Sequence, residues 1–180
     1  MQTYKILLVD DEEMILTALV RTLRSKEYHF FTAPSAEEAL EIINREKIDL
    51  VISDYKMGEV NGLQLLEEIS EVSPDTLNIL LTGNADIHMA IDAVNKAVLY
   101  KFILKPWDNE ELKISIKRAL EQKDLLTQNT FLANELQKRD KVISDLENQY
   151  PGISDVDADP SGNIILNLNN DNQVDDSSSP

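Results

Sequence analysis

Four apolar runs in this chain each end directly at a polar side chain, and this arrangement restricts the possible fold more than any other feature. The runs occupy residues 5–9, 49–53, 78–81 and 100–104. The polar residues that follow them are Asp10 with Asp11, Asp54, Thr82 and Lys105. Continuous runs of branched apolar residues are typical of strands buried on both faces of a parallel sheet. The sequence therefore predicts a layered α/β protein.

Segments with helical periodicity separate these runs. Residues 35–46 have Ser35 at the N-cap, Glu38 at the capping-box position and a stripe of apolar residues at helical spacing. Similar patterns occupy residues 14–25, 62–72, 86–97 and a segment that begins at Asn109. A weaker strand is expected at residues 28–32. Strand and helix thus alternate five times, which predicts a doubly wound, five-stranded parallel sheet with helices on both faces.

The polar residues at the strand ends are expected to converge, although they are far apart in the sequence. The carboxyl ends of parallel strands emerge at one edge of the sheet, and ligands of open α/β sheets bind at that edge. If Asp10, Asp11 and Asp54 meet there, their charges repel one another unless a cation offsets them. A hard divalent ion with oxygen ligands fits such a site, and Mg²⁺ fits it best.

These elements together resemble the receiver domain of two-component response regulators, and the resemblance covers about residues 3–122. It implies a flavodoxin-like (βα)₅ fold with strand order 2-1-3-4-5. It also implies that Asp54 accepts a phosphoryl group, because a carboxylate can form an aspartyl phosphate. The expected donor is a sensor histidine kinase or a histidine phosphotransfer protein. Such a protein is a signalling switch and not an enzyme that turns over a separate substrate.

The resemblance implies a role for each polar residue at this edge. The expected Mg²⁺ ligands are Asp10, Asp11, Asp54 and the backbone carbonyl of Lys56. Thr82 and Lys105 are expected to bind phosphoryl oxygens, and Thr82 and Phe102 to move as switch residues. A cis peptide bond is expected between Lys105 and Pro106. The expected recognition surface lies near Ala90, Ala93, Ala97, Lys101 and Ile103.

Two positions depart from the usual receiver pattern. Gly58 stands where such receivers usually carry proline, and glycine is expected to loosen the backbone near the metal site. Phe102 stands where many receivers carry a tyrosine, so a rotamer switch is retained without the hydroxyl. In addition, Gly83 is expected to leave the acceptor open to a bulky donor.

Charge and composition argue against several classes of function. The formal net charge is −16, and six aspartates after residue 150 contribute −6 of it. Such a field repels nucleic acid and anionic membranes, so neither is an expected partner. The chain has no cysteine, which suits a reducing compartment. It also lacks a signal-peptide pattern and an apolar stretch of ~20 residues, so a cytoplasmic location is expected.

The last predicted helix continues past the point at which a receiver ends, because no Gly or Pro interrupts residues 109–150. We expect a receiver domain at 1–122, a helical or coiled-coil extension at 123–150, and an acidic, largely disordered tail at 151–180 with no output domain. In a heptad repeat, the d positions are Leu125, Leu132, Arg139 and Leu146, and the a positions are Asn129, Leu136, Ile143 and Tyr150. This pattern predicts a homodimer, in which Asn129 favours parallel pairing.

Three alternatives stay open. The acidic pocket also suits a Mg²⁺-dependent phosphohydrolase with an aspartate nucleophile, although such enzymes place the nucleophile after the first strand and carry a cap. A receiver that binds partners without ever being phosphorylated would have the same fold. The extension is alternatively a single amphipathic helix folded back on its own receiver.

Overall fold

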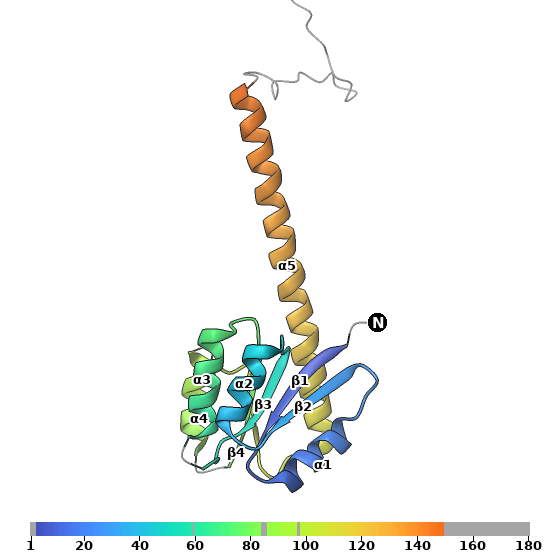
Figure 1. Cartoon of the computed structure of the whole chain (residues 1–180), viewed down its shortest axis with the longest axis vertical. Coiled ribbons are helices and arrows are strands. Elements are labelled where there is room, and N and C mark those ends of the chain that lie inside the picture. The colour runs from blue at the N-terminus through green and yellow to red at the C-terminus, as the bar shows by residue number, and fades with distance from the viewer. Residues whose placement is uncertain (1–2, 59, 84–85, 97, 150–180) are drawn as a thin grey trace, which may run out of the picture. The chain divides into compact units, whose positions relative to one another are not determined.

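A central parallel sheet forms the core of the protein (Figure 1). The structure is a computed structural model that describes residues 3–58, 60–83, 86–96 and 98–149. The strands are β1 (Tyr4–Val9), β2 (Tyr28–Ala33), β3 (Leu50–Asp54), β4 (Leu77–Thr82) and β5 (Lys101–Leu104). They are hydrogen-bonded in the order β2-β1-β3-β4-β5, and every pair is parallel. The predicted doubly wound sheet and its strand order are therefore confirmed.

Helices cover both faces of the sheet (Figure 1). In the described part of the chain they are α1 (Glu13–Leu23), α2 (Ala36–Arg45), α3 (Gly62–Val72), α4 (Ile87–Asn95) and α5 (Asn109–Gln149). Apolar residues of α2, α3 and α4 pack on one face, and those of α1 and the first part of α5 pack on the other. Because β3 is paired on both edges and covered on both faces, every one of its positions is buried. This burial explains why its sequence is a continuous apolar run that ends at a single charged residue.

Side-chain caps fix the starts of α2 and α3. Ser35 Oγ accepts a hydrogen bond from the Glu38 backbone N–H at 3.3 Å, as the sequence pattern predicts. Asn61 Oδ1 accepts from the Gln64 backbone N–H at 2.9 Å, and Gln64 Oε1 accepts from the Asn61 backbone N–H at 3.2 Å. This reciprocal cap starts α3 a few residues after Asp54 and so limits the length of the loop between them.

Polar contacts hold α5 to the amino-terminal edge of the sheet. Lys123 Nζ lies 3.2 Å from Asp49 Oδ1 and donates to the backbone carbonyl of Asp75 at 2.9 Å. One residue further along the helix, the Asp124 carboxylate accepts a hydrogen bond from the Tyr4 hydroxyl. We call Tyr4, Asp49, Lys123 and Asp124 the α5 anchor. It lies at the end of the sheet opposite to the strand ends that carry the predicted site.

The chain divides into two compact units, residues 1–128 and 129–180, and α5 contributes to both. In the second unit the structure describes residues 129–149, which are helical throughout. The large apolar side chains exposed there are Phe131, Leu132, Leu136, Val142, Ile143 and Leu146. Neither α5 nor any other described helix is long and apolar enough to cross a membrane. The tail predicted at 151–180 and heptad position Tyr150 lie outside the described residues, so the domain boundaries and the coiled coil stay predictions.

The predicted recognition surface on α4 and β5 is wrong for three of its five residues, and a fourth, Lys101, is partly exposed. Ala90 and Ala93 are buried against one face of the sheet, and Ile103 is buried on the other. Small side chains allow a helix to approach the sheet closely, so the alanines mark the packed side of α4. Its exposed apolar side chains are instead Met89 and Ile91. Ala97 lies outside the described residues.

Candidate functional site

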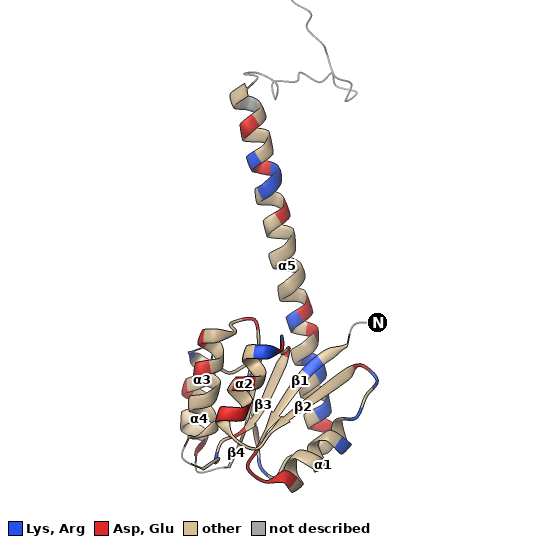
Figure 2. Ribbon diagram, in the orientation of Figure 1, with Lys and Arg blue, Asp and Glu red and all other residues tan. Residues whose placement is uncertain are grey.

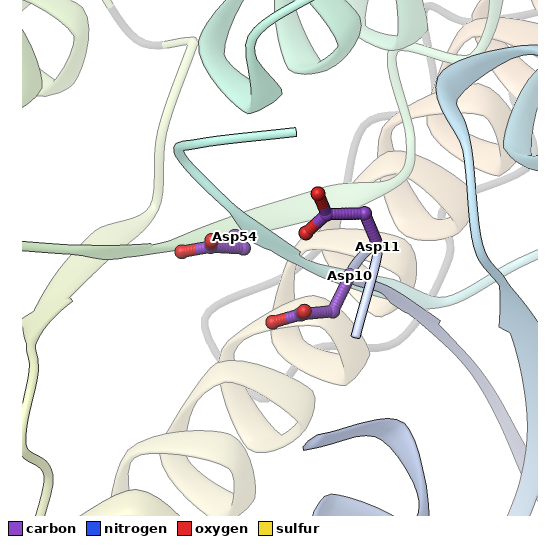
Figure 3. A group of neighbouring side chains, drawn as sticks. All are labelled: Asp10, Asp11 and Asp54. Atoms are coloured by element: carbon purple, nitrogen blue, oxygen red, sulfur yellow. The ribbon is translucent and has the colours of Figure 1, made fainter. Parts of the chain in front are cut away.

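Three carboxylates meet at the carboxyl-terminal edge of the sheet (Figure 3). Asp10 and Asp11 follow β1, and Asp54 is the last residue of β3, so adjacent parallel strands deliver them to the same place. One oxygen from each of the three carboxylates lies within 4.8 Å of the others. Asp10 is 1% exposed and Asp54 is 8% exposed, whereas Asp11 is open to solvent. The cluster therefore borders solvent on the Asp11 side.

Lys105 supplies the positive charge of this cluster. Its Nζ lies 2.9 Å from Asp54 Oδ1 and 3.6 Å from Asp10 Oδ2. Lys105 follows β5, and its peptide bond to Pro106 is cis, as predicted. The ammonium also lies 5.7 Å from the centre of the Trp107 ring, a cation–π distance that helps to orient the lysine. When all three carboxylates are ionised, the cluster keeps a net negative charge.

The environment of Asp10 disfavours its ionised form. Removal from water raises the pKa of Asp10, and the nearby Asp54 and Asp11 carboxylates add to this shift. The Glu12 backbone N–H, which donates to Asp10 Oδ1 at 2.9 Å, and the Lys105 ammonium oppose the shift. Asp10 Oδ2 is buried and accepts no hydrogen bond from the described residues. Such an oxygen is a position at which a bound cation would lower the free energy.

The residues present fit a hard divalent cation such as Mg²⁺. Carboxylate oxygens are the ligands that Mg²⁺ prefers, and Asp10, Asp11 and Asp54 offer them close together. The buried Asp10 Oδ2, which lacks a donor among the described residues, supports this fit. The fourth predicted ligand is the backbone carbonyl of Lys56, in the loop after Asp54. The Lys56 side chain is exposed, and its Nζ lies 3.7 Å from Asp86 Oδ2.

Thr82 lies on β4, the strand next to β3, and Phe102 lies on β5, one strand further from β3. Thr82 ends β4 and is fully buried, and its hydroxyl donates to the backbone carbonyl of Gly83 at 3.3 Å. Among the described residues, no hydrogen bond joins Thr82 to Asp54. Phe102, on β5, is partly buried and packs against the core beneath α3 and α4. The structure thus brings Asp10, Asp11, Asp54 and Lys105 together, while the two expected switch residues lie on β4 and β5.

Two structural roles at this site were missed in the sequence. A Cβ atom at Gly62 would lie 1.8 Å from the backbone oxygen of Asp54, so α3 begins in direct contact with the end of β3. The Tyr55 hydroxyl donates to Met89 Sδ at 3.1 Å, which joins the loop after Asp54 to α4. A glycine at the first position of a helical pattern was the only signal for the first role. The second contact joins residues 34 positions apart and leaves no sequence signal.

Gly58 has a specific conformation and not simply a loose one. Its φ is 51°, in the left-handed region that proline cannot adopt and that other residues rarely adopt. Nothing lies within 4 Å of the position that its Cβ would occupy, so backbone conformation and not space favours glycine here. The loop after Asp54 is therefore a turn that differs from one built with proline.

Comparison with known proteins agrees with this geometry. Residues 6–117 match the response regulator receiver domain family. The chain is 44% identical over 117 residues to the transcriptional regulatory protein GlrR of Escherichia coli K12. This alignment covers 65% of this chain and 26% of that protein. It is 35% identical over 127 residues to the C4-dicarboxylate transport transcriptional regulatory protein DctD of Rhizobium meliloti. This alignment covers 71% of this chain and 27% of that protein. The chain thus spans about a quarter of the length of these relatives.

Solved structures show the same relationship. A response regulator receiver domain protein from Clostridium thermocellum aligns with a TM-score of 0.64 and 36% identity, over 68% of this chain and 98% of that one. NtrX from Brucella abortus aligns with a TM-score of 0.67 and 31% identity, over 73% of this chain and 30% of that one. The family match, the strand order and the acidic strand ends agree, and the chain belongs to the response regulator receiver domain family.

Proposed function

We propose that this chain is a phosphorylation-dependent signalling switch in which Asp54 accepts a phosphoryl group. The supporting observation is that Lys105 Nζ lies 2.9 Å from Asp54 Oδ1 at an edge that also carries Asp10 and Asp11. Phosphoryl transfer depends mainly on positioning and on offsetting negative charge, and this arrangement provides both for one carboxylate. Membership of the receiver family supports the same assignment.

The transfer needs no general base from this chain. An oxygen of ionised Asp54 attacks phosphorus and forms the acyl-phosphate P–O bond, while the P–N bond to a donor histidine breaks. The electron pair of the broken bond stays on the ring nitrogen, and the histidine leaves as neutral imidazole when its other nitrogen carries the proton. The Lys105 ammonium, already placed against Asp54, is then positioned to pair with a phosphoryl oxygen.

The groups that we assign to Mg²⁺ are Asp10, Asp11, Asp54 and the backbone carbonyl of Lys56. When bound, the ion offsets the negative charge of the transferring group. The chain's own contribution is to hold three carboxylates within 4.8 Å of one another despite their repulsion. The hydrogen bond from the Glu12 backbone N–H to Oδ1 fixes Asp10 for this task, and its Oδ2, which lies 3.6 Å from Lys105 Nζ, accepts no hydrogen bond from the described residues.

Thr82 and Phe102 are the residues that we assign to the conformational response. The Thr82 hydroxyl bonds to Gly83 over 3.3 Å, and a charged phosphoryl oxygen is a stronger acceptor than this carbonyl. Rotation of Thr82 towards a phosphoryl group changes the space beside β5, where Phe102 is only partly buried. The segments α4, β5 and α5 would have two packed arrangements. Phosphorylation would shift the equilibrium between these arrangements, because the phosphoryl group makes different contacts in each.

The proposal includes partners and a division of the chain. We propose a sensor histidine kinase or a histidine phosphotransfer protein as donor, a cytoplasmic location, and self-association through α5 as the output. Residues 1–122 would form the receiver domain, 123–150 the helical extension and 151–180 an acidic tail. The unbroken helix from Asn109 to Gln149 supports direct coupling of the receiver to the extension.

Acetyl phosphate added with Mg²⁺ to the full chain tests this proposal. We expect stoichiometric labelling that is measured by intact-mass spectrometry, lost in Asp54→Asn, and abolished by removal of the divalent ion. Asp92→Asn, which changes an exposed carboxylate on α4, is the matched control and should be labelled like the wild type. Labelling that survives in Asp54→Asn, or a folded wild type that is never labelled, would overturn the proposal. Continuous release of phosphate from many esters would indicate a phosphohydrolase instead.

A further inference from the structure

Trp107 is an aromatic neighbour of the Lys105 ammonium. Lys105 Nζ lies 5.7 Å from the centre of the indole ring, 2.9 Å from Asp54 Oδ1 and 3.6 Å from Asp10 Oδ2. Two carboxylates and the electron-rich face of an aromatic ring therefore attract the same ammonium. The indole carries no net charge, so it attracts the lysine without adding to the repulsion among the carboxylates.

The surroundings of Lys105 are strongly acidic. Residues 10–13, in the loop before α1 and at its start, are all Asp or Glu, and Figure 2 shows this stretch in red. In such a field the ammonium pairs closely with the nearer of its two carboxylate partners, Asp54. Close pairing draws negative charge away from Asp54, whose oxygen has to attack phosphorus. A lysine held by carboxylates alone would therefore hinder the first stage of the transfer that it assists later.

The structure holds the Trp107 ring in a defined place. The side chain is partly buried and packs against the core cluster formed by the sheet, α1 and the first part of α5. Directly after Trp107, Asp108 Oδ1 accepts hydrogen bonds from the backbone N–H groups of Glu110 and Glu111, each at 2.9 Å. This cap fixes the backbone next to the ring at the start of α5. The indole is therefore a fixed surface against which a flexible lysine can rest.

We infer that Trp107 is a positioning residue for phosphoryl transfer, which shares the Lys105 ammonium with Asp54. This inference deepens the proposed function and rests on it. The shared ammonium leaves more negative charge on the attacking Asp54 oxygen, and it stays close enough to pair with a phosphoryl oxygen afterwards. Trp107 contributes no atom to the transfer and acts through Lys105. Loss of the attraction should let Lys105 pair more closely with Asp54 and so slow the labelling of this residue.

A purely structural role for Trp107 would be to pack the start of α5 onto the sheet. The two roles require different properties of the ring. Packing requires its size and shape, whereas attraction of a cation requires the negative charge of its face. Fluorine substitution withdraws this charge and changes the size of the ring only slightly. Fluorinated indoles therefore separate a positioning role from a packing role.

Fluorinated tryptophan tests the inference in the full chain. Trp107 is the only tryptophan, so biosynthetic incorporation of 5-fluoro-, 5,7-difluoro- and 5,6,7-trifluorotryptophan changes this position alone. With acetyl phosphate and Mg²⁺, we expect the rate constant for labelling of Asp54 to fall with each added fluorine, by about three- to tenfold over the series. Urea unfolding of the same proteins should show nearly constant stability.

The outcomes of this series distinguish the inference from the proposed function. Equal labelling rates across the series would overturn the inference and leave the proposed function intact. A fall in rate that follows a fall in stability would assign Trp107 to packing and overturn the inference as well. A folded, unsubstituted chain that is never labelled would overturn both.

A second measurement uses the metal-free protein and needs no phosphoryl transfer. The fluorine resonance of 5-fluorotryptophan responds to the local electric field, so Lys105→Met should shift it in the ¹⁹F NMR spectrum. The matched control is Lys117→Met, which removes an exposed ammonium from α5 and should leave the resonance in place. If neither substitution shifts the resonance, the ammonium does not rest against the ring and the inference fails.

Conservative substitution provides a third comparison. Trp107→Phe retains a weaker aromatic face and should keep an intermediate labelling rate, whereas Trp107→Leu should lose about three- to tenfold. Labelling of Trp107→Leu at the wild-type rate would contradict the inference.

Discussion

Lys123 Nζ lies 3.2 Å from Asp49 Oδ1, and this ion pair ties α5 to the residue that precedes β3. The side chains are 10% and 17% exposed, so the pair is largely removed from solvent. Asp49 also accepts from the Lys5 backbone N–H at 2.8 Å, which links the same carboxylate to β1. One aspartate thus joins two strands and a helix at the foot of the sheet.

Removal of the buried ammonium should therefore lower stability substantially. We expect Lys123→Met to reduce the free energy of unfolding by about 2–4 kcal/mol, because Asp49 is left buried without its cation. The matched control is Lys117→Met, which breaks an exposed pair with Glu121 and should change stability by less than about 0.5 kcal/mol. Urea denaturation followed by circular dichroism measures both. Equal effects of the two substitutions would mean that the Lys123 pair adds nothing to stability.

The hydrogen bond between Tyr4 and Asp124, the other half of the α5 anchor, should make the stability of the protein depend on pH in the alkaline range. This hydrogen bond, together with burial, raises the pKa of Tyr4 to about 12. Because the folded-state pKa is raised, ionisation costs folding free energy, and stability should fall as the pH rises from about 10 to about 12. Tyr4→Phe should remove this part of the decline, and at neutral pH it should cost about 1–3 kcal/mol. Thermal unfolding of wild type and Tyr4→Phe across this pH range tests the expected fall in stability. An equal fall in both proteins would contradict it.

Gly62 should tolerate no side chain. A Cβ atom there would lie 1.8 Å from Asp54 O and 2.7 Å from Ser53 Oγ, so Gly62→Ala must displace either α3 or the end of β3. We expect a loss of more than about 3 kcal/mol of stability together with loss of Asp54 labelling. Gly83→Ala is the matched control, because nothing lies within 4 Å of its added methyl group, and it should change stability by less than about 1 kcal/mol. Normal stability and labelling of Gly62→Ala would show that the contact is not obligatory.

Ionisation of the buried Asp10 side chain should lower the stability of the metal-free protein at neutral pH. Burial raises the pKa of Asp10, so its ionisation costs folding free energy above that pKa, and this cost disappears as the pH falls towards about 4. Asp10→Asn keeps an acceptor for the Glu12 backbone N–H and should melt at a higher temperature than wild type at pH 7 without Mg²⁺. The difference in melting temperature between Asp10→Asn and wild type should become smaller at acid pH. With Mg²⁺, wild type should gain stability and the variant should gain little. A variant that is less stable than wild type at neutral pH without metal would reverse this assignment.

Much of the fold could be read from residue order, for reasons that the structure makes plain. Strands buried on both faces require uninterrupted apolar runs, so each run and its polar end were visible in the sequence. Parallel topology then brings Asp10, Asp54 and Lys105 together without any further information. The sequence could not place the Thr82 hydroxyl, because a rotamer depends on local acceptors such as the Gly83 carbonyl.

Other features left little or no periodic signal. Asp49 was assigned to a strand, but it precedes β3, and its side chain binds a lysine 74 residues away. Alanines on α4 were read as an outer surface, yet alanine is compatible with both an exposed and a closely packed position. Lys123 lies just beyond the predicted receiver boundary and is buried, which no charge pattern in the helix indicates.

β3 is five residues long and buried throughout, with Asp54 as its last residue and Asp49 directly before its first. These two aspartates are therefore separated by about 17 Å of extended backbone. Interiors are close-packed and resist compression, so a displacement of one end along the strand axis must displace the other. The phosphorylation site that we propose and the attachment point of the long helix are thus the two ends of one buried strand.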